Sequence, residues 1–187
     1  MLDLEYEGDA RAEVDAAPQA DLRRPYLLYQ LGKELEVDGR FELAVEAYRE
    51  AHLNTPAAAP WRHPLVIHYL YCLKRVGHFE PALAVVDAES DAFAQSPDFF
   101  FTVGDLLLDL ALAQPQRAAT LHPLIEGSWL KCLEIGDRPG LPGAVLGSGS
   151  FLAARNLAGF YESTGRLERA QEYRALSAPE PTGVPTW

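Results

Sequence analysis

Cysteine and basic residues are both scarce in this chain. It has only two cysteines, Cys72 and Cys132, which lie far apart in apolar surroundings and lack C-x-x-C spacing. Neither a disulfide framework nor a zinc site is predicted, and both cysteines are expected to be buried, reduced thiols. The 16 basic residues are outnumbered by 27 acidic ones, which gives a formal charge of -11. This charge repels nucleic-acid backbones and anionic lipids, so neither nucleic acid nor a membrane is an expected partner.

Long hydrophobic runs are also missing. No uninterrupted apolar segment reaches the roughly 18 residues that a membrane helix needs. The most apolar segment, FFFTVGDLLLDLALA, is broken by Gly104, Asp105 and Asp109. The N-terminus is acidic where a signal peptide would be basic and then apolar. We therefore expect a soluble, cytoplasmic protein, and a composition of 48% apolar and 23% charged residues fits one globular domain.

Small residues recur at short intervals in a segment that otherwise has a helical pattern. From Pro25 to Glu36 leucines are spaced by three and four residues, Gly39 follows, and a second apolar pattern runs from Phe41 to Pro56. Glycine just past a helix adopts a positive φ at little cost, so Gly39 predicts the turn of a helical hairpin. We expect Gly32 and Ala44 where the two helices cross, because small side chains let backbones approach closely.

The hairpin pattern recurs along the chain, as it should if one hairpin cannot bury both of its faces alone. Gly77 and Gly165 take the place of Gly39 in YLYCLKRVGHFEPALAVVDAE and NLAGFYESTGRLERAQEYRAL. Between them, Gly104 takes the place of Gly32 in PDFFFTVGDLLLDLALAQP, and RAATLHPLIEGSWLKCLEIGD provides the partner helix. The predicted repeat units span about 25–58, 63–96, 97–136 and 148–178.

These positions resemble the tetratricopeptide repeat (TPR), a helical hairpin with a period of about 34 residues. The first unit matches the repeat at Leu28, Leu31, Gly32, Leu35, Gly39, Ala44, Tyr48, Ala51 and Pro56. The resemblance implies an all-α superhelix of antiparallel helix pairs with about eight or nine helices. We expect residues 25–178 to form the TPR-like domain, residues 1–24 to form a capping segment with a helix at Asp9 to Ala17, and residues 179–187 to form a flexible tail.

A loop rich in glycine and proline, GDRPGLPGAVLGSGSFLAARN, runs from Gly136 to Asn156. A phosphate-binding loop needs Lys and Ser or Thr directly after its last glycine, and a dinucleotide site needs a preceding strand; the sequence predicts neither. We expect Ser148 or Ser150 to cap the helix that begins near Phe151, while the glycines allow a close approach to the preceding repeat. No cofactor is predicted.

Three segments, CLEIGD, GSGSF and NLAGFYESTGRLERA, follow one another in an order that points to a narrower group of repeat proteins. Together with YQLGKELEVDGRFELAVEAYREA and LVIHYLYCLKRVGHFEPALAVVD, they are similar to the C-terminal repeat region of bacterial family 2 glycosyltransferases. In that family sugar transfer belongs to a preceding α/β domain with an Asp-x-Asp motif. This chain contains no such motif, so the resemblance implies no catalytic residue here, and any glycosyltransferase activity would lie in another domain.

Histidine and cysteine do not predict a reactive site. His63 and His68 lie five residues apart, which places them about 140° apart around a helix and prevents them from sharing one metal ion. Cys72 lies one helical turn after His68, where a thiol and an imidazole could touch. Because the neighbours of Cys72 are apolar, a packed thiol is the expectation, and no metal is predicted.

The remaining candidate site is the concave groove that TPR arrays line with the first helix of each pair. The resemblance places these residues in it: Tyr29, Lys33 and Glu36; Ile67, Tyr71 and Lys74; Phe101, Asp105 and Leu108; Arg155 and Glu162. Aromatic side chains and cations in an acidic protein would suit an extended protein or peptide segment. The alternative is that these side chains merely complete the repeat surface.

We therefore predict a non-catalytic scaffold that binds a protein or peptide, with an acceptor protein or a glycosyltransferase domain as the candidate partners. Two other hypotheses stay open. In one, the chain contacts glycan, and Tyr29, Tyr71 and Phe101 stack on sugar rings. In the other, it forms a homodimer through DFFFTVGDLLLDLALA, whose apolar residues exceed what one helix face can hide.

Overall fold

The computed structural model describes the backbone of residues 6–178 and the side chains of residues 22–178. Within these residues the chain has eight α-helices, one short 3-10 helix and no strand, which confirms the predicted all-α class. No helix in this part of the chain combines the length and the apolar character that spanning a bilayer requires. Contacts divide the chain into two compact units, which meet in sequence between Val76 and Gly77.

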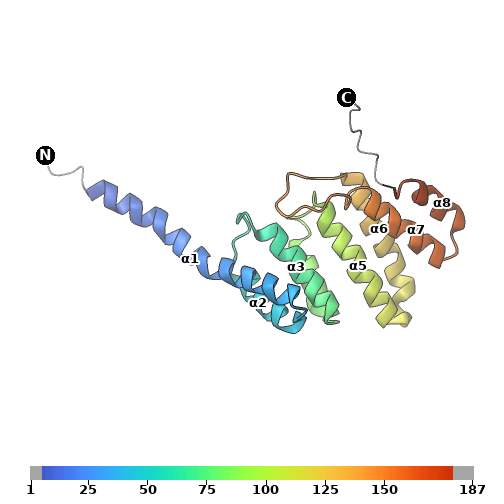
Figure 1. Ribbon diagram of the computed structural model, residues 1–187, viewed down its shortest axis with the longest axis horizontal. Coiled ribbons are helices and arrows are strands. Elements are labelled where there is room, and N and C mark those ends of the chain that lie inside the picture. Colours follow the sequence, from blue (N-terminus) through green and yellow to red (C-terminus); the bar gives the residue numbers. More distant parts are fainter. Residues whose placement is uncertain (1–5, 179–187) are drawn as a thin grey trace, which may run out of the picture. The chain divides into compact units, whose positions relative to one another are not determined.

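The first unit contains three helices, α1 (Tyr6–Val37), α2 (Phe41–Asn54) and α3 (Arg62–Arg75), shown in blue to green in Figure 1. Helix α2 packs against both α1 and α3, and α1 also contacts α3. The expected hairpin of the first repeat is thus present as α1 and α2, and α3 covers one side of it.

The turn between α1 and α2 is closed by backbone hydrogen bonds around Gly39. The N–H of Arg40 donates to the carbonyl of Leu35 at 2.8 Å, and Gly39 has a φ of 72°. An L residue with a Cβ is strained at this φ, which explains the glycine. Gly165 repeats the arrangement in the second unit with a φ of 75°. The turns predicted from these glycines are confirmed.

The crossing of α1 and α2 depends on the missing side chain of Gly32. A Cβ on Gly32 would lie only 2.4 Å from the ring of Tyr48. Ala44 and Tyr48 have no exposed surface at all. Gly32 and Ala44 therefore occupy the close crossing that the sequence predicted.

The N-terminal segment is helical at Asp9 to Ala17, as expected, but it is part of a longer helix. The helix expected at Asp9 to Ala17 is not a separate element, because α1 is continuous from Tyr6 to Val37. The segment contains many good helix formers and lacks a glycine turn like the one at Gly39. The side chains of residues 1–21, with any capping role, and the predicted tail at 179–187 lie outside the described residues.

The second unit contains the other helices. They are α4 (Phe79–Glu89), α5 (Pro97–Ala113), the 3-10 helix η1 (Pro115–Arg117), α6 (Ala118–Ile135), α7 (Phe151–Ser163) and α8 (Leu167–Ala175). Helix α6 packs between α5 and α7, α8 packs on α7, and α4 contacts α5. Figure 1 shows α5, α6 and α7 side by side in this unit.

Helix α5 crosses α6 in the same way that α1 crosses α2. A Cβ on Gly104 would lie 2.4 Å from Nε1 of Trp129, and Trp129 is almost completely buried. The prediction that Gly104 takes the role of Gly32 is confirmed. In both units a large aromatic ring fills the space that the glycine leaves.

Burial accounts for much of the strongly apolar sequence of α5. Phe99, Val103, Leu106, Leu107 and Leu110 are all buried, whereas Phe100, Phe101 and Leu108 stay partly exposed. Leu112 is the strongly exposed exception.

Two glycines of the second unit make a matched test of the close crossing. Gly104→Ala should lower the free energy of unfolding by about 1–3 kcal/mol, because its Cβ must displace the buried Trp129 ring. Gly159 lies in α7, where a Cβ would meet nothing, so Gly159→Ala should raise the free energy of unfolding by about 0.5–1 kcal/mol. Urea denaturation measures both, and stabilisation by both variants would show that the crossing tolerates a side chain.

Candidate functional site

Four of the predicted groove residues lie on two helices of the first unit that contact each other. Lys33 from α1 and Ile67, Tyr71 and Lys74 from α3 are all partly exposed, and α1 contacts α3. We call the surface formed by Lys33, Ile67, Tyr71 and Lys74, with the neighbouring Phe41 and Arg75, the α1–α3 face.

Cations lie over aromatic rings on the α1–α3 face. Nζ of Lys33 lies 5.5 Å from the centre of the Tyr29 ring, and Nζ of Lys74 lies 5.8 Å from that of Tyr71. Such contacts attract the cation to the ring and restrict its movement.

Arg75 and Phe41 belong to this face although they were not predicted. The guanidinium carbon of Arg75 lies 4.7 Å from the ring centre of Phe41 and 6.0 Å from that of Tyr71. The two rings meet edge to face with centres 6.2 Å apart. The spacing of Tyr71 and Arg75 by one helical turn was the signal available in the sequence, whereas the contribution of α2 through Phe41 required the fold.

Tyr29 is mainly a packing residue. It is 6% exposed, and its ring lies 6.3 Å from each of the rings of Tyr26, Tyr48 and His68. Little of its surface is left for stacking on a ligand, so its contribution to the α1–α3 face is to hold Lys33.

Glu36, which we expected on the groove surface, is the acceptor of a hydrogen-bond network inside the first unit. The hydroxyl of Tyr48 donates to Oε2 of Glu36 at 2.7 Å, and Nδ1 of His68 lies 2.9 Å from the same oxygen. The side chain of Glu36 is 18% exposed. One carboxylate therefore connects α1, α2 and α3.

The network sets the charge state of its members. Burial alone would raise the pKa of Glu36, but hydrogen bonds from His68 and Tyr48, with the charge of His68, bring the pKa below its ordinary value of 4.5. Burial, reinforced by the Glu36 carboxylate, raises the pKa of the Cys72 thiol. Cys72 and Cys132 are both free and buried, as predicted, and Cys72 is held as a thiol rather than a nucleophilic thiolate.

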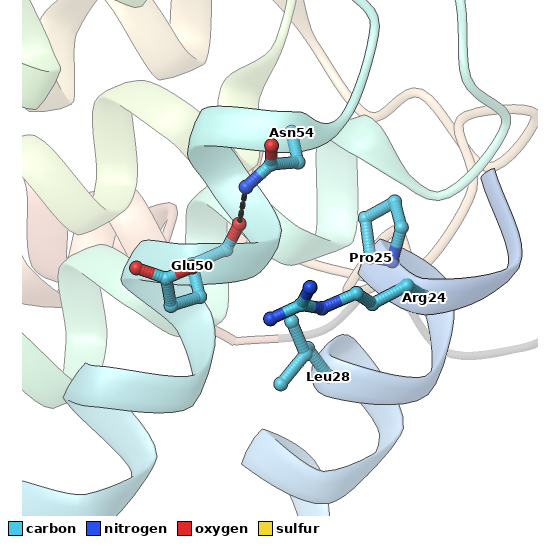
Figure 2. A pocket seen from close by; sticks show the side chains of 5 residues that line it. All are labelled: Arg24, Pro25, Leu28, Glu50 and Asn54. Carbon is cyan, nitrogen blue, oxygen red and sulfur yellow. Dashed lines mark hydrogen bonds between the residues drawn. The ribbon is translucent and has the colours of Figure 1, made fainter. Parts of the chain in front are cut away.

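A shallow cleft outside the predicted site lies between α1 and α2. Its lining is formed by Arg24, Pro25 and Leu28 of α1 and by Glu50 and Asn54 of α2, as Figure 2 shows. The amide of Asn54 is turned back to the carbonyl of Glu50, to which it donates at 2.8 Å. The cleft holds only about 160 Å³ and is open to one side, so it is too small for a drug-sized ligand.

The second unit brings together the other predicted residues. Oδ1 of Asp105 on α5 accepts a hydrogen bond of 2.9 Å from the amide of Asn156 on α7. Arg155, next to Asn156, is exposed, and Phe101, one turn before Asp105, is partly exposed. This hydrogen bond links α5 to α7, which carry the predicted residues Phe101 and Arg155. The carboxylate of Asp105 is bound to Asn156.

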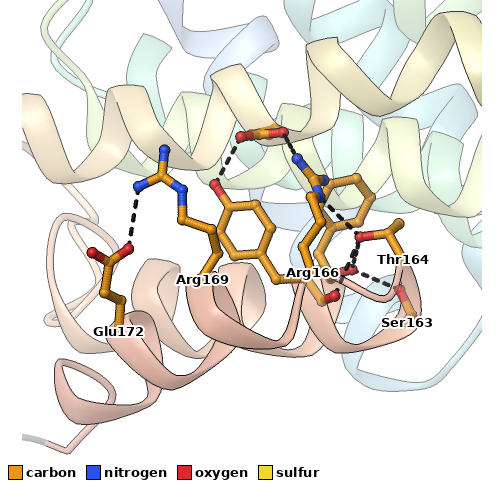
Figure 3. Close-up of polar contacts among 8 residues, drawn as sticks. Ser163, Thr164, Arg166, Arg169 and Glu172 are labelled. Carbon is orange, nitrogen blue, oxygen red and sulfur yellow. Dashed lines mark hydrogen bonds and ion pairs between the residues drawn. The ribbon is translucent and has the colours of Figure 1, made fainter.

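A second network closes the α7–α8 hairpin (Figure 3). The carboxylate of Glu126 on α6 accepts from the hydroxyl of Tyr161 at 2.8 Å and from Arg166 at 2.6 Å. The guanidinium of Arg166 also lies over the Tyr161 ring, 4.5 Å from its centre. These contacts hold the last hairpin to α6.

The glycine-rich loop is organised by Asp137, which the sequence analysis did not single out. Its carboxylate accepts from the N–H of Gly147 at 3.1 Å, the N–H of Gly149 at 2.9 Å and the hydroxyl of Ser150 at 2.7 Å. The prediction that Ser148 or Ser150 caps α7 is wrong: Ser150 stands at the cap position, but α7 has no side-chain cap and the hydroxyl of Ser150 binds Asp137 instead.

The expected close approach of this loop is present. A Cβ on Gly149 would lie 2.2 Å from the backbone carbon of Gly136. The loop is therefore a packed structural element that folds back on the end of α6. Among the described residues, no cluster of three or more His, Cys, Asp or Glu side chains has a geometry that could hold a metal ion.

The Glu36 network predicts a specific acid sensitivity. The folded-state pKa of Glu36 is below its ordinary value of 4.5, so ionised Glu36 stabilises the fold at neutral pH. This stabilisation is lost as the pH falls below 4.5 and through the folded-state pKa. Glu36→Gln should cost about 1–3 kcal/mol at pH 7 because the partners lose a charged acceptor.

The measurement is the free energy of unfolding of wild type and Glu36→Gln from about pH 7 to about pH 3.5, a range that spans the titration of a carboxyl group. The gap between the two proteins should shrink toward acid pH. A gap that stays constant over the range would mean that the charge of Glu36 does not support the fold.

Comparison with known proteins supports the fold. No protein-family model and no curated protein sequence matches the chain. Seven chains of solved structures match it, among them the crystal structure of MamA, with a TM-score of 0.58. The alignment covers 92% of this chain and 91% of that chain at 14% sequence identity. At this identity the likeness is one of fold, and it confirms that the chain has the TPR-like all-helical fold predicted from its sequence.

Proposed function

We propose that the chain is a non-catalytic scaffold that binds a protein or peptide segment on the first helices of its hairpins, with the α1–α3 face as its main contact surface. The observation that carries this proposal is the set of cations held over aromatic rings on that face: Lys33 on Tyr29, Lys74 on Tyr71 and Arg75 on Phe41. These cations lie in a chain whose formal net charge is -11.

The chemistry of the face favours an extended acidic segment. Cations restrained by rings lose less conformational entropy when they bind a carboxylate than freely rotating ones would. The partly exposed Ile67 and Tyr71 add apolar and aromatic contact area to the charges. A peptide with carboxylates spaced around an apolar residue would satisfy both kinds of contact.

The second unit would offer a smaller surface of the same kind. Phe101 and Arg155 supply an aromatic ring and an exposed cation, while Asp105 is fixed by Asn156. A partner with an acidic and an apolar side chain could use these two residues in the same way.

A random peptide library displayed on phage tests the proposal, with enriched peptides resynthesised for titration. We expect enrichment of acidic peptides, and Lys33→Ala with Lys74→Ala should weaken their binding by about tenfold or more. The control is Lys131→Ala with Arg169→Ala, which removes the same charge from exposed ion pairs with Glu134 and Glu172. No enrichment, or equal binding by the two double variants, would contradict the proposal.

We further propose that this scaffold is related to the C-terminal repeat region of bacterial family 2 glycosyltransferases and works beside such an enzyme in the cytoplasm. The similarity of CLEIGD, GSGSF and NLAGFYESTGRLERA supports this relation. The test is to titrate the purified chain against a catalytic domain with an Asp-x-Asp motif encoded next to it. Saturable binding that the Lys33 and Lys74 substitutions weaken is the expected result, whereas absence of binding would count against the relation.

A further inference from the structure

Helix α1 has a second exposed face that differs from the one toward α3. Arg24, Leu27, Leu31 and Glu34 follow one another at steps of three and four residues, which places them on one side of the helix. Leu27 is 57% exposed and Leu31 is 45% exposed, and Arg24 and Glu34 are exposed as well. The face therefore presents two leucines between a cation and an anion.

The centre of this face has the form that receives a side chain in helix packing. Arg24, Leu27, Leu28 and Leu31 stand at positions i, i+3, i+4 and i+7, and with Arg23 they line a shallow, mainly apolar depression of about 390 Å³. Four residues in this relation form the hole into which a knob from a facing helix fits. The cleft drawn in Figure 2, which shares Arg24 and Leu28, continues the depression toward α2.

The order of side chains on the face makes it complementary to itself. When two copies of α1 run antiparallel about a twofold axis midway between Leu27 and Leu31, Leu27 of one copy faces Leu31 of the other. The same axis places Arg24 opposite Glu34, and both contacts occur twice. In a parallel arrangement equal charges would face each other instead.

We propose that the chain self-associates through this face of α1, which packs antiparallel against α1 of a second copy. Leucines enter the holes on the facing helix, and the two Arg24–Glu34 pairs fix the direction and register. Because the net charge of -11 opposes unspecific association, the complementary charges are what selects this contact. The patch covers about three helical turns, from Arg24 to Glu34, so the association is weak and reversible.

Sedimentation equilibrium of the full chain from about 10 μM to about 1 mM brackets such a weak interface. We expect wild type to pass reversibly from monomer to dimer over this range. Leu27→Glu with Leu31→Glu should abolish the dimer. Arg24→Glu and Glu34→Arg should each raise the dissociation constant by about tenfold or more, because like charges then meet twice.

Charge exchange gives the decisive measurement. An equimolar mixture of the Arg24→Glu and Glu34→Arg proteins should form heterodimers at the wild-type strength, because each pair again joins opposite charges. The double variant R24E/E34R should regain the homodimer. All four positions are exposed, and equal thermal unfolding of the variants and wild type shows that the changes leave the fold intact.

A wild type that remains monomeric across the concentration range overturns the proposal, even if another protein is found on the face. A mixture of the two charge variants that remains monomeric overturns it as well. The Lys33 and Lys74 variants that test peptide binding should dimerise like wild type. Failure of the peptide-binding proposal and failure of the self-association proposal can therefore be told apart.

Discussion

Contact between a glycine backbone and a large aromatic ring determines the helix crossings of both units. At Gly32 and Gly104 a Cβ would overlap the rings of Tyr48 and Trp129, so each ring lies directly on the backbone of the facing helix. The rings are almost completely buried and fill the space between the helices. Close packing of this kind fixes the distance and the register of a hairpin, because neither helix can slide without moving a ring into occupied volume.

The polar network of the first unit depends on this packing. The Tyr48 ring lies against Gly32, its hydroxyl reaches Glu36 one turn further along α1, and the same carboxylate contacts His68 on α3. The position of α3 beside α1 is thus connected to the glycine contact through one tyrosine. Lys33 lies on α1 and Lys74 lies on α3. The contacts that hold α3 beside α1 therefore also set the positions of these two cations relative to each other.

The sequence predicted the elements that depend on local patterns. Leucine periodicity placed the helices, and a positive φ just past a helix end required Gly39 and Gly165. It did not predict interactions that depend on which residues meet in space. Ser150 has the right place for an N-cap, but Asp137, thirteen residues earlier in sequence, takes its hydroxyl. Glu36 has the spacing of a groove residue, yet its carboxylate is bound by the hydroxyl of Tyr48 from the next helix and by His68.

The two proposals use two different faces of helix α1. Lys33 lies about 120–160° around the helix from Leu27 and Leu31, at 100° per residue, so a peptide on the α1–α3 face does not cover the leucines. Binding and self-association therefore do not compete for the same surface of α1. In the proposed dimer the two copies of the α1–α3 face would be joined through paired helices, so a partner with two acidic segments would meet its second site at a high effective concentration. A weak association between chains would then be strengthened by the partner itself, because binding at both sites stabilises the dimer by mass action.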